Sequence, residues 1–171
     1  MVEDLGVILA IISDTHLPRG ARALPPACVE RLRAADAILH AGDFSELSVL
    51  AELVALGPPV HAVRGNVDSA ELQARLPLSR IVEASGARIA MLHDAGPATG
   101  RLERMRRRFP DADAVVFGHS HLPLHEERDG FAIFNPGSPR SGNGTSIASK
   151  SRGTTVAGNV ARASSRTSRG K

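Results

Sequence analysis

Residues 37–44 are Ala37-Ile38-Leu39-His40-Ala41-Gly42-Asp43-Phe44, an apolar run that stops at a glycine followed by an acid. This pattern predicts a buried β-strand that ends at Gly42 and presents the carboxylate of Asp43. In an α/β sheet, ligands bind outside the carboxyl ends of the strands, which is where Asp43 would lie. Because a carboxylate has two oxygens, Asp43 can hold two hard metal ions side by side.

Further side chains that can bind a metal follow other apolar segments. They occur in Asp14-Thr15-His16, Gly65-Asn66-Val67-Asp68, His93 and Gly118-His119-Ser120-His121. Carboxylate and imidazole ligands together suit Mn²⁺, Fe or Zn²⁺ better than Ca²⁺. Each motif is weak evidence by itself, because such short patterns are common. Their combination predicts that the segments converge on Asp43 and form a two-metal hydrolytic site.

The hydrophobic periodicity predicts alternating strands and helices followed by hairpins. We expect strands at 5–13, 37–42, 60–63 and 114–117, helices at 27–35, 45–56, 69–76 and 101–109, and hairpins at 80–92 and 126–134. Ser85-Gly86 and Asp129-Gly130 are the expected hairpin turns. The fold class is therefore α/β.

The 171 residues are enough for one domain with a sizeable core. Residues 141–171 contain six basic and no acidic residues, are rich in Ser, Gly and Arg, and have only scattered apolar positions. We therefore expect a folded domain at 1–140 and a basic tail at 141–171 that is largely disordered, with a weak strand near 154–156. The single cysteine, Cys28, excludes an intrachain disulfide framework and a thiolate zinc cluster.

The sequence contains no apolar run of the roughly 18 residues that a membrane helix needs. Its first residues include Glu3 and Asp4 in place of the basic segment that begins a signal peptide. We therefore expect a cytoplasmic protein with no membrane partner.

The motifs taken together resemble those of the calcineurin-like metallophosphoesterase family, and within it the short bacterial and archaeal phosphodiesterases, over about residues 7–140. The resemblance implies a four-layer α/β/β/α sandwich of two mixed β-sheets flanked by helices. It implies that one metal is held by the residues matching Asp14, His16, Asp43 and His121. The other would be held by those matching Asp43, Asn66, His93 and His119, with Asp43 bridging the two.

Two cations about 3.5–4 Å apart lower the pKa of a shared water and clamp the phosphoryl oxygens. The expected reaction is therefore hydrolysis of a small phosphodiester or phosphomonoester by a metal-bridging hydroxide. We expect Mn²⁺, with Fe, Ni²⁺ or Zn²⁺ as alternatives, and assign catalytic roles to Asp43, Asn66 and Asp68. For Asp68 a purely structural role is about equally favoured.

The sequence departs from the family pattern in three places. Val67 stands where many relatives have a histidine that stabilises the phosphate or protonates the leaving group, which predicts a preference for good leaving groups. Asp94 stands where relatives usually have glycine. Relatives also continue past the turn at 135–138 with two strands, for which this sequence has no convincing counterpart.

The sequence is compatible with two other functions. The chain could be a catalytically weak, metal-binding protein-interaction scaffold on the same fold, as in the retromer subunit that resembles these enzymes. It could also be a nuclease, through the basic helix at 101–108 or the basic tail. No aromatic residues are interleaved there for base stacking, so nucleic acid is not expected except at the tail, and a solvated face is the expected role of the helix. A homo-oligomer is compatible with the sequence.

Overall fold

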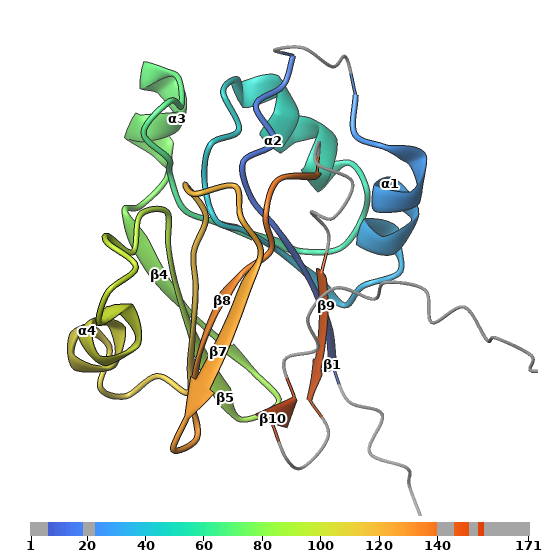
Figure 1. Cartoon of the computed structure of the whole chain (residues 1–171). Helices are drawn as coiled ribbons and strands as arrows, with labels where there is room; N and C mark the ends of the chain where they lie inside the picture. Colours follow the sequence, from blue (N-terminus) through green and yellow to red (C-terminus); the bar gives the residue numbers. More distant parts are fainter. Residues whose placement is uncertain (1–6, 19–22, 140–145, 151–153, 156–171) are drawn as a thin grey trace, which may run out of the picture.

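The computed structural model describes residues 7–18, 23–139, 146–150 and 154–155, which form two five-stranded β-sheets and four helices (Figure 1). The first sheet has the order β10-β9-β1-β2-β3 and the second has the order β4-β5-β6-β8-β7. The helices are α1 (Pro26–Arg33), α2 (Leu47–Val54), α3 (Ala70–Arg75) and α4 (Arg101–Arg108).

Parallel strands form the centre of the first sheet. Strand β1 (Val7–Ile12) pairs in parallel with β2 (Ala37–His40), and β2 pairs in parallel with β3 (Val60–Ala62). The sequence between these strands forms the connecting helices, as βαβ units require. Because all three strands point the same way, their carboxyl ends meet at one edge of the sheet.

The second sheet is mixed. The hairpin of β4 (Ser79–Ala84) and β5 (Ala87–Leu92) is antiparallel, and β5 pairs in parallel with β6 (Ala114–Val116). Strand β6 also pairs in parallel with β8 (Phe131–Asn135), whose antiparallel partner is β7 (Leu124–Arg128). Both expected hairpins are therefore present.

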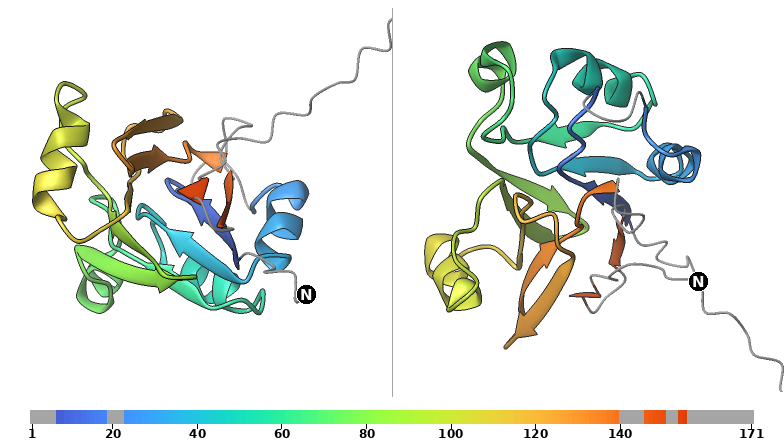
Figure 2. Two further views of the ribbon diagram at one scale, coloured as in Figure 1. Left: turned by 90° about the horizontal axis from the view of Figure 1, so that it is seen from below. Right: turned by 45° about the horizontal axis from the view of Figure 1, so that its top comes forward.

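Three apolar layers hold the sheets and helices together. Alternate residues of β1 divide between two of them: Ala10 and Ile12 pack with α1–α3, while Leu9 and Ile11 face the second sheet. A third cluster joins the other face of the second sheet to Leu102 and Met105 of α4. Figure 2 shows α4 on one side of the pair of sheets and α1 on the other. The expected four-layer α/β/β/α sandwich of two mixed β-sheets is confirmed.

The C-terminal region contributes two strands to the first sheet. Strand β9 (Ser146–Lys150) pairs antiparallel with β1, and β10 (Thr154–Thr155) pairs with β9. The expected weak strand near 154–156 is thus present at 154–155. The expectation that this chain lacks the relatives' two further strands was wrong, because the edge of β1 offers backbone partners that compensate for the low apolar content of 146–150. The rest of the expected disordered tail lies outside the described residues.

Within the described ranges, every helix is too short or too polar to cross a bilayer.

Candidate metal centre

The candidate ligands gather where the carboxyl ends of five strands converge. Asp14, Asp43 and Asn66 follow β1, β2 and β3 of the first sheet, whereas His93 and His119 follow β5 and β6 of the second. Backbone hydrogen bonds join the ends of neighbouring strands. For example, the Asp14 N–H after β1 donates to the Gly42 carbonyl after β2 at 3.0 Å. The side chains that the sequence predicts to bind metal, including His16 and His121, therefore meet in one place.

One group of four side chains offers two carboxylates and two imidazoles. Ligand atoms of Asp14, His16, Asp43 and His121 all lie within 4.8 Å of one another. The Nε2 atoms of His16 and His121 are 3.1 Å apart, and they lie 3.6 Å from Asp43 Oδ2 and 3.5 Å from Asp14 Oδ1, respectively. This donor set fits a cation, because both negative oxygens and both nitrogens converge on one small volume.

A second group shares Asp43 with the first. His93 Nε2 lies 3.2 Å from Asp43 Oδ2 and 3.0 Å from Asn66 Oδ1. His119 Nδ1 lies 3.1 Å from the same Asn66 oxygen. The His93 Nδ1 atom donates to the Ala41 carbonyl at 2.8 Å, so Nε2 is the ring nitrogen that gains or loses a proton: when protonated it donates to Asp43, and when deprotonated its lone pair faces the group.

Five of these ligands adopt a left-handed backbone conformation that side chains rarely favour. The φ angles are 54° at Asp14, 47° at His16, 61° at Asp43, 68° at His119 and 57° at His121. Such conformations cost on the order of 1 kcal/mol each and persist where the surroundings impose them, often at functional sites. The backbone strain is therefore concentrated at the candidate metal centre.

Charge couples Asp43 to His93. Burial by itself raises the pKa of Asp43, but the hydrogen bond and the charge of His93 outweigh it and leave the pKa below its ordinary value. Burial likewise lowers the pKa of His93, but Asp43 outweighs it and leaves that pKa raised. The partly buried His16 has its pKa lowered, chiefly by burial. Asp43 therefore attracts a positive charge at the junction of the two groups.

Sequence reasoning missed the residues that hold Asp14 and the His119 loop. Ser13 Oγ donates to Asp14 Oδ2 at 2.6 Å, and Ser138 Oγ donates to the Asp14 carbonyl at 2.9 Å. Asn135 Nδ2 donates to the Gly118 carbonyl at 2.7 Å. The Asn-Pro-Gly-Ser turn at 135–138 is the sequence signal for this support.

Asp68 is placed to orient the backbone. The side chain is 4% exposed, and its oxygens accept from the Ser45 N–H at 3.0 Å and from the Gly65 N–H at 2.7 Å. These bonds link the loop after β2 to the loop after β3. The geometry thus favours the structural role that the sequence left open for Asp68.

A family model described as the calcineurin-like phosphoesterase superfamily domain matches residues 7–164. The chain belongs to this family. A probable metallophosphoesterase of Methanothermobacter thermautotrophicus is 34% identical over 135 residues, covering 78% of this chain and 77% of the relative. A phosphodiesterase of Methanocaldococcus jannaschii is 29% identical over 142 residues, covering 75% of this chain and 82% of that protein.

Solved structures show the same fold in proteins with different names. Vacuolar protein sorting 29 from Cryptosporidium parvum matches this calcineurin-like chain with a TM-score of 0.70 and 28% sequence identity. The match covers 79% of this chain and 76% of the Cryptosporidium protein. A Thermotoga maritima protein has a TM-score of 0.70 and 26% identity, covering 90% of this chain and 97% of its own.

Only part of α4 forms the solvated face that we expected in this phosphoesterase domain: Arg107 and Arg108 are exposed, whereas Arg101 and Arg104 bind the loop after His93. Arg101 donates through Nε and Nη2 to the Gly96 carbonyl at 3.2 and 2.8 Å, and Arg104 Nη2 donates to the Ala95 carbonyl at 2.7 Å. The loop after His93 presents carbonyls that have no strand partner, and the two guanidinium groups satisfy them. Two of the five arginines of α4 thus hold a loop of the candidate metal centre.

His40 supports the loop of Asp43 from the core. Its ring is fully buried and stacks on Phe44 with centroids 3.5 Å apart. The Gly42 N–H donates to His40 Nδ1 at 3.2 Å, so the proton of the neutral ring is on Nε2, which lies 3.3 Å from Thr15 Oγ1. Burial lowers the pKa of His40 to about 3 from an ordinary value of 6.5.

We expect the buried His40 to make the folded protein less stable at acidic pH. Because its folded pKa lies below its unfolded pKa, the unfolded chain binds more protons between these values. The stabilising contribution is therefore complete above pH 6.5 and falls as the pH drops towards 3, by at most about 1.4 kcal/mol per pH unit. Urea unfolding of the wild type and His40→Gln at about pH 7.5 and about pH 5.5 measures it. The difference in the free energy of unfolding between the wild type and His40→Gln should be smaller at the lower pH. A difference that does not change with pH would contradict a lowered pKa of His40.

Proposed function

We propose that this calcineurin-like phosphoesterase hydrolyses a small phosphodiester with the help of two divalent cations, Mn²⁺ being the first choice. The observation that carries the proposal is the pair of donor groups that share Asp43 Oδ2, within 3.6 Å of His16 Nε2 and 3.2 Å of His93 Nε2. The relative named as a phosphodiesterase supports the choice of a diester. Monoester hydrolysis stays the alternative within the same chemistry.

Asp14, His16, Asp43 and His121 would hold one cation, and Asp43, Asn66, His93 and His119 the other. When bound, such cations lower the pKa of a shared water and offset charge on the phosphoryl oxygens. The protein keeps the donors aligned: Asp43 Oδ1 accepts from the Val67 N–H at 3.1 Å, and Asp14 Oδ1 accepts from the His119 N–H at 3.0 Å. Asp43 and Asn66 would then act at the reacting phosphate, and Asp68 would position their loops.

The Val67 side chain cannot protonate a leaving alkoxide. Val67 contributes its backbone N–H to Asp43, so the third position of this motif serves the ligand and not the substrate. We therefore infer a preference for esters whose leaving group is stable without a proton, such as a nitrophenolate.

The first experiment measures hydrolysis of bis-p-nitrophenyl phosphate and p-nitrophenyl phosphate with Mn²⁺, beside an EDTA-treated sample. We expect turnover with Mn²⁺, its loss after EDTA treatment and its return when Mn²⁺ is added back, with the diester hydrolysed faster. Titration calorimetry with Mn²⁺ alone should give two ions per chain. Turnover that EDTA leaves intact, or one ion per chain, would overturn the two-cation proposal.

A metal-binding protein-interaction scaffold is the second candidate. The similarity to vacuolar protein sorting 29, at 28% identity, favours it. Two bound ions per chain without turnover of either ester would favour the scaffold over the enzyme. A cytoplasmic location and assembly into a homo-oligomer stay proposals, as does contact with nucleic acid at the basic tail.

A further inference from the structure

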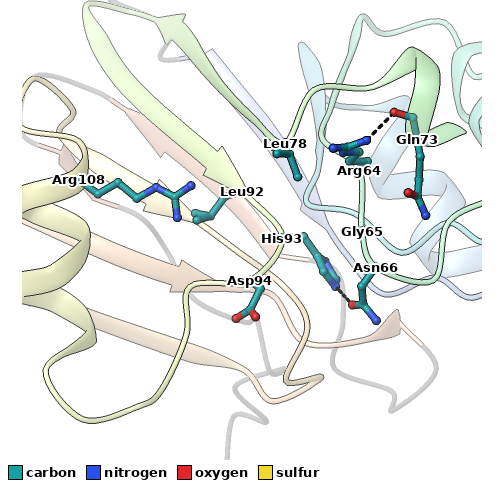
Figure 3. Close-up of a pocket in the computed structure, with 9 residues that line it drawn as sticks. All are labelled: Arg64, Gly65, Asn66, Gln73, Leu78, Leu92, His93, Asp94 and Arg108. Atoms are coloured by element: carbon teal, nitrogen blue, oxygen red, sulfur yellow. Dashed lines mark hydrogen bonds between the residues drawn. The ribbon is translucent and has the colours of Figure 1, made fainter.

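A pocket of about 420 Å³ opens beside the candidate metal centre (Figure 3). It lies between the loop after β3 and the end of β5, and Asn66 and His93 line both the pocket and the centre. A phosphoryl group held at the centre would therefore place one of its ester substituents in this pocket. The volume is in the range of pockets that bind small organic molecules.

Two arginines give the pocket a positive charge. Arg64 is half-buried, and its Nη1 donates to the Gln73 carbonyl at 2.9 Å, which leaves the other guanidinium donors available. Arg108 is exposed at the end of α4 and extends towards Leu92 in Figure 3. Among the described residues, neither arginine forms an ion pair, so their charges are available to an anionic ligand.

The other lining residues supply an apolar surface and one acid. Leu78 is 64% exposed and offers an aryl or alkyl group a surface to pack against, whereas Leu92 is 2% exposed and only forms part of the pocket wall. Asp94 lines the pocket, but its Oδ1 accepts from the Gly96 N–H at 2.7 Å within its own loop. The two guanidinium groups and one carboxylate leave a net positive charge.

We propose that this pocket selects phosphodiesters in which one substituent carries a second oxyanion, a carboxylate or a phosphate. Arg64 and Arg108 are then specificity-determining residues: guanidinium groups bind such oxyanions by charge-assisted hydrogen bonds. The apolar part of the substituent packs on Leu78. This inference rests on the proposed phosphodiesterase function and names the class of its substrate.

The test compares two p-nitrophenyl phosphodiesters whose other substituent is phenyl or 4-carboxyphenyl. The measured quantity is the ratio of their kcat/KM values, carboxyphenyl over phenyl, which exceeds one for the wild type. We expect the exposed Arg108→Gln change to lower the ratio about threefold. Arg64→Gln, at the half-buried site, lowers it about tenfold. Asp94→Asn, which removes a repelling charge, raises it.

Arg107→Gln is the matched control, because Arg107 is an exposed neighbour on the same helix, carries the same charge and does not line the pocket. The ratio of kcat/KM values for the two esters should be the same in Arg107→Gln as in the wild type. A wild-type ratio of one or less would overturn the inference. An equal fall in Arg107→Gln and Arg108→Gln would also overturn it, because the preference would then reflect the general charge of α4.

A binding measurement separates this inference from the proposed function. If neither ester is hydrolysed, the phosphodiesterase proposal fails, and calorimetry with phenyl phosphate and 4-carboxyphenyl phosphate in the presence of Mn²⁺ still tests the pocket. Tighter binding of the carboxylated compound that weakens in Arg108→Gln supports an oxyanion site. Equal affinities for the two compounds would overturn it.

Discussion

Asp43→Asn should lower metal-dependent hydrolysis of bis-p-nitrophenyl phosphate by about 10²–10³-fold, the scale of losing one preorganised charge-stabilising group. Asp43 belongs to both donor groups, and its Oδ2 lies within reach of His16 and His93. An amide of the same shape keeps an oxygen for the Val67 N–H but removes the negative charge that attracts the cations. Calorimetry should show at least one Mn²⁺ fewer per chain.

The control for this substitution is Glu127→Gln, which removes one negative charge from an exposed position on β7. Its hydrolysis should match the wild type. A urea unfolding curve of each variant shows whether the fold is retained. Full activity in a folded Asp43→Asn protein would contradict the bridging role, and equal losses in both variants would show that net charge alone sets the rate.

Gly65→Ala should destabilise the protein and displace Asp43. A Cβ atom at position 65 would lie 1.9 Å from Asp43 Oδ1 and 2.2 Å from the Asp43 backbone nitrogen, far inside contact distance. Because the nitrogen belongs to the backbone, the loop after β2 or the loop after β3 must move. Overpacking of this kind costs about 3 kcal/mol, and urea unfolding measures it. We also expect Mn²⁺ binding to weaken, because the displaced residue, Asp43, is the proposed shared ligand.

Gly130→Ala gives the comparison that isolates the steric clash. Gly130 has a φ of 74° in the turn between β7 and β8, and a Cβ there would meet no atom within 4 Å. The substitution therefore costs only about 1 kcal/mol of backbone strain and leaves Mn²⁺ binding intact. A Gly65→Ala protein as stable as Gly130→Ala would show that the two loops do not pack closely at position 65.

The residue pattern alone predicts the alternation of strands and helices and the residues that end the strands. An apolar run that stops at a glycine and an acid indicates a strand end, as at Gly42-Asp43, because a buried strand cannot carry an unpaired charge. Parallel strands place their carboxyl ends at one edge, so Asp14, Asp43 and Asn66 could be expected to meet. Local sequence carries this information because periodicity and strand ends depend on neighbouring residues.

The tertiary structure decided which distant segments support the site. Strand β9 has weak strand character of its own and forms because β1 offers it an edge. Tertiary packing also brings Ser138 Oγ to the Asp14 carbonyl, and it places Arg64 and Arg108, which are far apart in the chain, on the lining of one pocket. Such contacts depend on the packing of the two sheets and α4, which no local pattern of residues encodes.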